Sequence, residues 1–186
     1  MSDDKPFVAS AKRYLDMSVV TGRYSAGLIR EINAHVENET ANIFPIIEEI
    51  GALDGSKNAR PSRTKPAGQF KGRWLKGLWH KHYTQARFML TNLKRHWTPD
   101  RLRCLIMNSF GSREFSEDLS KGIVQGYWER GSEGRLTGEW LVLAKQGDVN
   151  YYLTLDTHTE DDEAIWRRCK ACAAEFPHLR IIQEDR

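Results

Sequence analysis

Histidines and arginines in the middle of the chain are the residues best suited to chemistry. Imidazole exchanges a proton near neutral pH, and guanidinium groups bind phosphate. His80 shares one face of a predicted helix with Thr84 and Arg87, so the histidine could move a proton while the arginine holds a phosphate, as metal-independent RNA cleavage requires. Residues two apart on a helix point about 200° from each other, so His82 is predicted to be a buried, hydrogen-bonded core histidine that does not act with His80.

A further histidine, His158, lies between a predicted strand and a predicted helix. Side chains at such a junction are presented at the edge of a sheet, where binding and catalytic residues are common. We expect His158 to be the second half of an acid and base pair with His80, or else an exposed residue just before a helix. The catalytic candidates are therefore His80, His158 and Arg87.

A strongly basic band surrounds these residues. Residues 57–103 hold thirteen Lys and Arg but only one acid, Asp100, whereas the whole chain has a net charge of only +3. Both flanking segments are acidic. This contrast predicts a surface that faces a polyanion, with RNA favoured, or an acidic protein partner. The alternative is a solvated face that pairs with the acidic flanks. The candidate nucleic-acid-binding residues are Arg73, Lys76, Thr84, Lys94 and Arg95.

Metal and cofactor sites lack a matching motif. Cys169 and Cys172 form a single C-x-x-C on the inner face of a predicted helix, without the second pair that makes a zinc site specific. The three cysteines are better read as core or free thiols in a reducing compartment. The sequence has no phosphate-binding loop, dinucleotide fingerprint, H-E-x-x-H or G-x-S-x-G motif. We therefore expect no metal and no cofactor.

A long, basic, amphipathic central helix over residues 70–97 is predicted to carry the candidate residues. Its apolar positions recur at helical spacing and define a buried stripe, with the basic residues opposite. The positions of this stripe are Leu75, Leu78, Trp79, His82, Ala86, Met89, Leu90, Leu93 and Trp97.

The remaining segments predict an α+β fold in one domain over residues 1–186. Residues 1–53 form an N-terminal helical layer, residues 54–69 a mobile basic loop, and residues 70–130 helices. Residues 138–186 form a hairpin, a helix and a third strand over residues 179–183, giving a small ββαβ sheet.

The location and partners follow from composition. With 40% hydrophobic residues and no apolar run of membrane-spanning length, the chain is not expected to meet a membrane. The first residues lack a secretory signal pattern, which predicts a cytoplasmic protein. The oligomeric state stays open.

Residues 138–158 show one weak likeness to a known group. This hairpin with its terminal histidine is broadly similar to the end of the sheet in small ribonuclease toxins of the barnase and RelE type, although the predicted C-terminal helix and strand depart from the RelE pattern. The resemblance implies a toxin-type, metal-independent ribonuclease. The leading hypothesis is a nucleic-acid-binding protein with that activity, and the alternative is a non-enzymatic interaction module, such as an inhibitor or assembly subunit.

Overall fold

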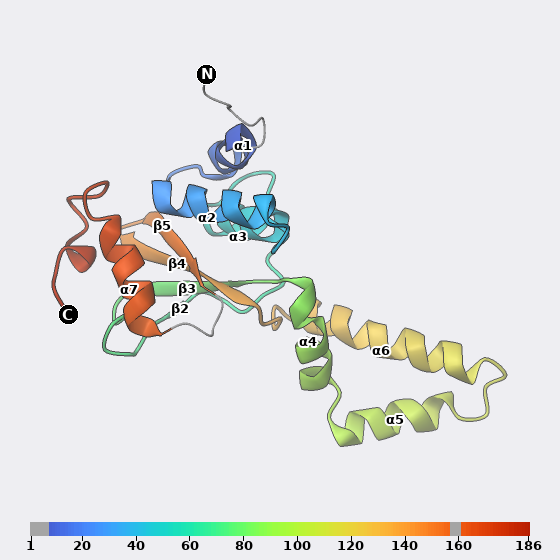
Figure 1. The fold of residues 1–186 in the computed structure, drawn as a ribbon. Helices are drawn as coiled ribbons and strands as arrows, with labels where there is room; N and C mark the ends of the chain where they lie inside the picture. The colour runs from blue at the N-terminus through green and yellow to red at the C-terminus, as the bar shows by residue number, and fades with distance from the viewer. Residues whose placement is uncertain (1–7, 157–160) are drawn as a thin grey trace.

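A five-stranded mixed sheet forms the centre of the computed structural model, which describes residues 8–156 and 161–186 (Figure 1). Its strand order is β1-β5-β4-β3-β2, and all neighbours are antiparallel except β1 and β5. The strands are β1 (Arg23–Tyr24), β2 (Gly68–Gln69), β3 (Trp79–Tyr83), β4 (Glu139–Gln146) and β5 (Val149–Asp156). Together with seven α-helices among the described residues, the sheet confirms the predicted α+β class.

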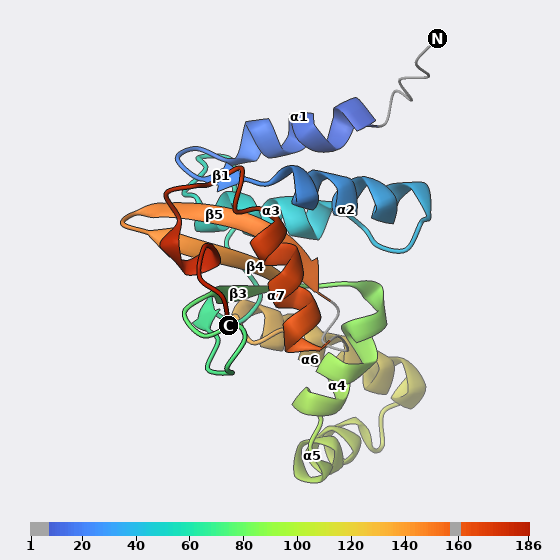
Figure 2. The same cartoon turned by 60° about the vertical axis from the view of Figure 1, so that its left-hand side comes forward.

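Three N-terminal helices cover one side of this sheet, as predicted (Figures 1 and 2). They are α1 (Val8–Ser18), α2 (Ala26–Glu37) and α3 (Phe44–Leu53). Ser25 caps α2 by accepting a hydrogen bond from the Leu28 amide at 2.9 Å, and Pro45 lies in the first turn of α3. Their apolar faces bury Leu15, Leu28, Ile32, Ile46 and Ile50 against the sheet residues Tyr83, Leu141, Leu143 and Tyr152.

The helix α7 (Asp162–Ala171) and the C-terminal segment pack on the other side of the sheet (Figure 2). Ile165, Trp166, Cys169 and Cys172 meet the strand residues Val142, Ala144, Tyr151 and Leu153 in a second buried cluster. Both cysteines are buried and reduced, as predicted for core thiols. The sheet is therefore covered on both sides.

Three helices, α4 (Met89–His96), α5 (Pro99–Ser109) and α6 (Phe115–Ser132), project away from the sheet as a helical arm (Figure 1). Thr98 caps α5 through its side chain, as the Thr-Pro-Asp sequence predicts. Gly126 and Gly122 lie where a Cβ atom would collide with His96 and Leu105. These glycines therefore let α6 approach α4 and α5 closely. None of the helices described in residues 8–156 and 161–186 is long and apolar enough to cross a membrane.

The predicted central helix over residues 70–97 is wrong. The chain instead makes turns around Leu75 and Leu78, which are buried in the second cluster, then the strand β3, the short 3-10 helix η1 (Ala86–Phe88) and α4. Gly77 has a φ of +90°, a conformation that a helix does not use. The aromatic and alternating sequence of residues 79–83 fits a strand, and pairing with β4 satisfies its backbone.

The predicted third strand of the ββαβ unit is also wrong. Residues 180–182 form a 3-10 helix, η2 (Arg180–Ile182). Leu179 and Ile182 are both buried, three residues apart, which suits one face of a helical turn rather than alternate faces of a strand. The hairpin of β4 and β5 and the following helix α7 are confirmed.

Candidate functional site

His80 and His82 extend from the same side of β3, and their ring centroids lie 5.7 Å apart. This corrects the prediction that the two histidines face opposite ways. In a strand, alternate side chains point to the same side of the sheet. The pair lies on the side covered by α7, because the intervening Lys81 points the other way, to Glu49 of α3 at 3.3 Å. We call this side, with the two histidines, the histidine face.

His80 is a half-buried ring held between aromatic neighbours. Its centroid lies 4.6 Å from that of Phe70 and 5.0 Å from that of Trp140. Opposite it in the β2 ladder is Gly68, where a Cβ atom would come within 3.2 Å of the His80 ring. The absence of a side chain at residue 68 therefore lets the imidazole lie over the edge strand.

His82 is buried and hydrogen-bonded, as predicted. It is 6% exposed, and its Nδ1 lies 3.0 Å from the Gly138 carbonyl oxygen. The Gly138 amide nitrogen is farther from the same atom, at 3.4 Å. Both contacts hold the imidazole of His82 against the Gly138 backbone.

Two rows of side chains extend this face across the sheet. His82 pairs with Trp140, and Trp140 pairs with Asp156 at the end of β5. His80 pairs with Val142, which in turn pairs with Thr154. Residues opposite each other on neighbouring strands share a side of the sheet, so a buried carboxyl group, Asp156, lies on the same side as the two imidazoles.

Asn92 of α4 connects this face to the helical arm. It is fully buried, donates to the Thr137 carbonyl at 2.8 Å, and accepts from the Thr137 amide at 2.9 Å. Its amide oxygen also accepts from Nε of Arg130 at 3.3 Å. Thr137 immediately precedes Gly138. The buried side chain of Asn92 therefore fixes both Arg130 and the backbone that holds His82.

Positive charges gather at the junction of α4, α6 and the loop before β2. Burial lowers the pKa of Lys65, and the nearby Arg95 and Arg130 lower it further. Burial likewise lowers the pKa of Arg130, and repulsion by Arg135 and Arg95 adds to this effect. We call Lys65, Arg95, Arg130 and Arg135 the basic rim. Like charges held this close together attract an anionic ligand.

The other predicted binding residues lie on two elements. Lys94 and Arg95 are exposed on α4, and neither forms an ion pair within the described part of the chain. Arg73 and Lys76 are exposed on the turn between β2 and β3. This turn is fixed by Arg186, whose guanidinium donates to the Lys76 carbonyl at 2.8 Å.

Arg87 and Thr84 are not brought together with His80. Arg87 forms an ion pair with Glu139, which is fully buried and also accepts a hydrogen bond from Tyr83 at 2.9 Å. Tyr83 faces the N-terminal helices, so this pair lies on the opposite side of the sheet from the histidine face. Thr84 lines cavities on that same side. The predicted grouping of His80 with Arg87 is therefore wrong, because it rested on the helix that does not form.

His158 lies outside the described residues, so its predicted role stays a prediction. The structure also adds three residues that the sequence did not single out, namely Lys65, Arg130 and Asp156, and it places His82, predicted only as a core histidine, beside His80. The alternating pattern Trp-His-Lys-His-Tyr over residues 79–83 is the signal that could have placed His80 and His82 together. Arg130 and Lys65 carry no such local signal, because tertiary packing brings them to Arg95.

Comparisons with protein-family models, curated proteins and solved structures find no match to this chain. The functional argument therefore depends on the geometry of the histidine face and the basic rim.

Proposed function

We propose that this protein binds single-stranded RNA through the basic rim and cleaves it at the histidine face without a metal ion. The observation that supports this proposal most directly is the pair of imidazoles, His80 and His82, on one side of β3 with ring centroids 5.7 Å apart. Two proton-transfer groups beside a cationic surface are the minimum that such a reaction needs.

The proposed reaction is an internal transfer of the phosphoryl group. In the proposed reaction His82 in its neutral form accepts the proton of the ribose 2′-hydroxyl, and the 2′-oxygen forms a bond to phosphorus. The bond from phosphorus to the 5′-oxygen breaks, and protonated His80 donates its proton to that leaving oxygen. The products are a 2′,3′-cyclic phosphate and a 5′-hydroxyl end, and no oxidant, reductant or water is consumed in this step.

The basic rim supports the proposal through charge. Developing negative charge on the phosphoryl oxygens is stabilised by guanidinium and ammonium groups fixed in advance. Arg130 is held by Asn92 and is 6% exposed, so it adds its positive charge from beneath the surface, while Lys65 and Arg95 are exposed and can contact a phosphate. Lys94 and Arg95 extend the positive surface along α4.

A direct test incubates the pure protein, in EDTA, with end-labelled RNA and with DNA of the same sequence. The proposal expects RNA to be bound and cleaved to fragments that end in a 2′,3′-cyclic phosphate, and DNA to be bound without cleavage because it lacks the 2′-hydroxyl. Cleavage of DNA at the same rate, or no binding of either polymer, would refute it.

A second candidate function is a non-enzymatic interaction module, and the helical arm favours it. Met107, Phe110 and Val124 are 67%, 77% and 54% exposed on this arm, and apolar side chains that gather on a surface mark interaction sites. Purification at low salt separates the two functions. Copurifying nucleic acid, seen as raised absorbance at about 260 nm, supports the first, and a stoichiometric protein partner supports the second.

A further inference from the structure

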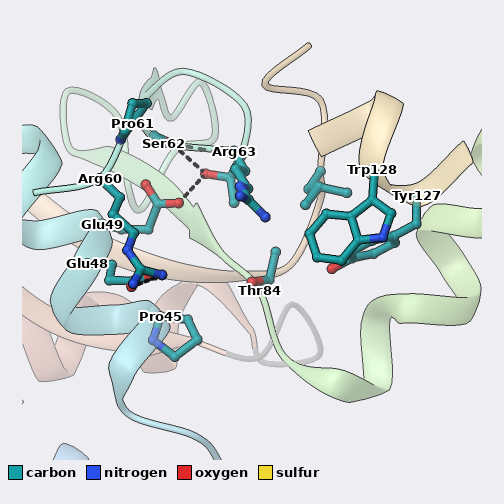
Figure 3. A pocket seen from close by; sticks show the side chains of 12 residues that line it. Pro45, Glu48, Glu49, Arg60, Pro61, Ser62, Arg63, Thr84, Tyr127 and Trp128 are labelled. Carbon is teal, nitrogen blue, oxygen red and sulfur yellow. Dashed lines mark hydrogen bonds and ion pairs between the residues drawn. The ribbon is translucent and has the colours of Figure 1, made fainter. Parts of the chain in front are cut away.

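A groove opens on the side of the sheet opposite the histidine face, between α3, the loop before β2 and α6 (Figure 3). It has a volume of about 220 Å³ and includes Pro45, Arg60, Arg63, Thr84 and Trp128 in its lining. A second cavity of about 370 Å³ shares Pro45, Thr84 and Tyr127 with it and continues toward Arg87. None of these residues is used by the proposed cleavage reaction.

Trp128 is the most distinctive residue of this groove. Its indole is 51% exposed although tryptophan is among the most costly side chains to leave in water. The guanidinium carbon of Arg63 lies 5.2 Å from the ring centroid, an arrangement in which the cation faces the π-system. In Figure 3 the Trp128 ring stands at one end of the groove and Arg63 points toward it. An exposed indole beside a guanidinium matches the requirements of base stacking next to a phosphate.

The positive charge of the groove also suits a nucleotide, because the phosphate of a nucleotide is negative. Arg60 and Arg63 are both exposed, and the contact of Arg60 with Glu48 is long, 3.7 Å between the charged atoms, in a pair that is 81% and 52% exposed. An exposed pair of this kind contributes little energy, so Arg60 can exchange it for a phosphate. The volume is below the roughly 300 to 1,000 Å³ of pockets for drug-sized ligands, and it suits one base better than a large cofactor.

The groove is connected to the histidine face through β3. Thr84, in the lining, comes two residues after His82. Thr64, also in the lining, donates to the His82 carbonyl oxygen at 2.8 Å and is followed in the chain by Lys65 of the basic rim. A single-stranded RNA that passes over the end of β3 can therefore reach both the groove and the histidine face.

We infer that Trp128 and Arg63 form a base-stacking subsite for single-stranded RNA, in which the indole stacks on one base and Arg63 and Arg60 contact the flanking phosphates. This inference rests on the proposed RNA binding but not on the cleavage step. The subsite anchors the strand at a distance from the reacting phosphate. Stacking is tolerant of sequence because every base has a π-face.

The test compares two fluorescein-labelled probes of equal charge: a 2′-O-methyl decaadenylate, which cannot be cleaved by 2′-hydroxyl attack, and the same backbone without bases. We expect the wild-type protein to bind the probe with bases about 5 to 100 times more tightly. Trp128→Ala should remove most of that preference and leave the affinity for the abasic probe unchanged, whereas Trp128→Phe should retain it. Gln125→Ala, at an exposed position three residues earlier on α6, is the matched control and should behave as wild type.

The outcomes separate the subsite from the proposed function. Equal affinity of the wild-type protein for both probes overturns the subsite and leaves RNA binding standing. A preference that survives Trp128→Ala, or an equal loss on both probes in that variant, also overturns the subsite. Failure of the wild-type protein to bind either probe overturns the subsite and the proposed function together.

Discussion

His80 and His82 lie side by side on β3 because residues two apart in a strand share a side of the sheet, and their centroids are 5.7 Å apart. The proposed reaction requires both rings to reach one phosphodiester. Neither ring stands alone in the protein: Phe70 and Trp140 fix His80, and the Gly138 carbonyl fixes His82. The account therefore predicts that changes in this support alter cleavage.

Gly68→Val is expected to displace His80. The added Cβ atom would meet the imidazole at 3.2 Å, and the larger side chain would push the ring away from its position. We expect the rate of RNA cleavage to fall about 10- to 100-fold, as small misplacements of reacting groups do, while RNA affinity is unchanged. The measurement is single-turnover cleavage together with fluorescence anisotropy. Ala67→Val, one residue earlier, is the control. An unaltered cleavage rate in a folded Gly68→Val protein would show that the position of His80 does not matter.

Arg87 is expected to support folding rather than catalysis. Its partner Glu139 is fully buried, whereas Arg87 is 51% exposed. Arg87→Ala leaves that buried carboxylate with the Tyr83 hydroxyl as its remaining hydrogen-bond donor among the interactions described above. We expect a loss of about 2 kcal/mol in the free energy of unfolding, measured by urea denaturation.

The double variant Arg87→Ala with Glu139→Gln should recover part of this loss, because the buried charge is removed with its partner. Arg167→Ala, which breaks the exposed pair with Glu163 on α7, is the control and should change stability by less than about 0.5 kcal/mol. If Arg87→Ala left stability unchanged but abolished cleavage, the catalytic role predicted from the sequence would have to be restored.

Asp54 is expected to make stability depend on acid. Burial works to raise the pKa of Asp54, but hydrogen bonds from the backbone amides of Gly22, Thr21 and Val20 lower it below the ordinary value. The folded state thus favours the carboxylate, so the stabilisation is present above the unfolded pKa of about 3.9 and is lost as the pH falls through the lower folded pKa. Asp54→Asn should cost about 2 kcal/mol at neutral pH.

This cost should shrink in acid, because the wild-type carboxyl group is then protonated as well. The measurement is the difference in unfolding free energy between wild type and Asp54→Asn at a series of pH values from neutral to below 3.9. A difference in unfolding free energy that stays constant over this range would mean that the negative charge of Asp54 does not contribute to stability.

Arg95 is expected to contact phosphate. It is exposed on α4 and lowers the pKa values of Lys65 and Arg130, which places it within the basic rim. Removing one phosphate contact to a single strand should reduce the slope of log affinity against log salt by about 0.7. Arg95→Ala is therefore expected to weaken RNA binding at low salt and to flatten its salt dependence. Lys12→Ala, on α1 and paired with Asp16, is the control, and an unchanged slope for Arg95→Ala would remove this residue from the interface.

The elements that the sequence predicted correctly are those with local signals. Ser25 and Thr98 cap their helices through short-range hydrogen bonds, and the hairpin of β4 and β5 follows from two β-rich runs with a tight turn between them. The helix α7 follows from acidic residues in its first turn and apolar positions at helical spacing. Such signals do not depend on distant parts of the chain.

The central segment could not be predicted in the same way. Leu75, Leu78 and His82 fall at helical spacing, but the first two are buried from a turn and the third from a strand. β3 is stabilised by pairing with β4, which is far away in the sequence. The strand propensity of residues 79–83 alone does not reveal such a pairing. As a result His80 was selected from its sequence context, whereas its neighbour His82 was assigned to the opposite face.

The basic rim shows a second reason why the candidate site could not be predicted completely from the sequence. The sequence located the excess of positive charge in residues 57–103, and Lys65 and Arg95 belong to it. Arg130 lies outside that window, in a segment whose net charge is negative, and reaches the rim because Asn92 holds it there. Charge counting along the chain therefore identified two members of the basic rim but not Arg130.

The central claim is tested most directly by the cleavage rate of labelled RNA in EDTA, under single-turnover conditions, for wild type, His80→Gln, His82→Gln and the control His178→Gln. The account predicts a loss of about 100-fold or more for each of the first two variants, with RNA affinity retained, and a wild-type rate for the control. Cleavage by His80→Gln at the wild-type rate would contradict it.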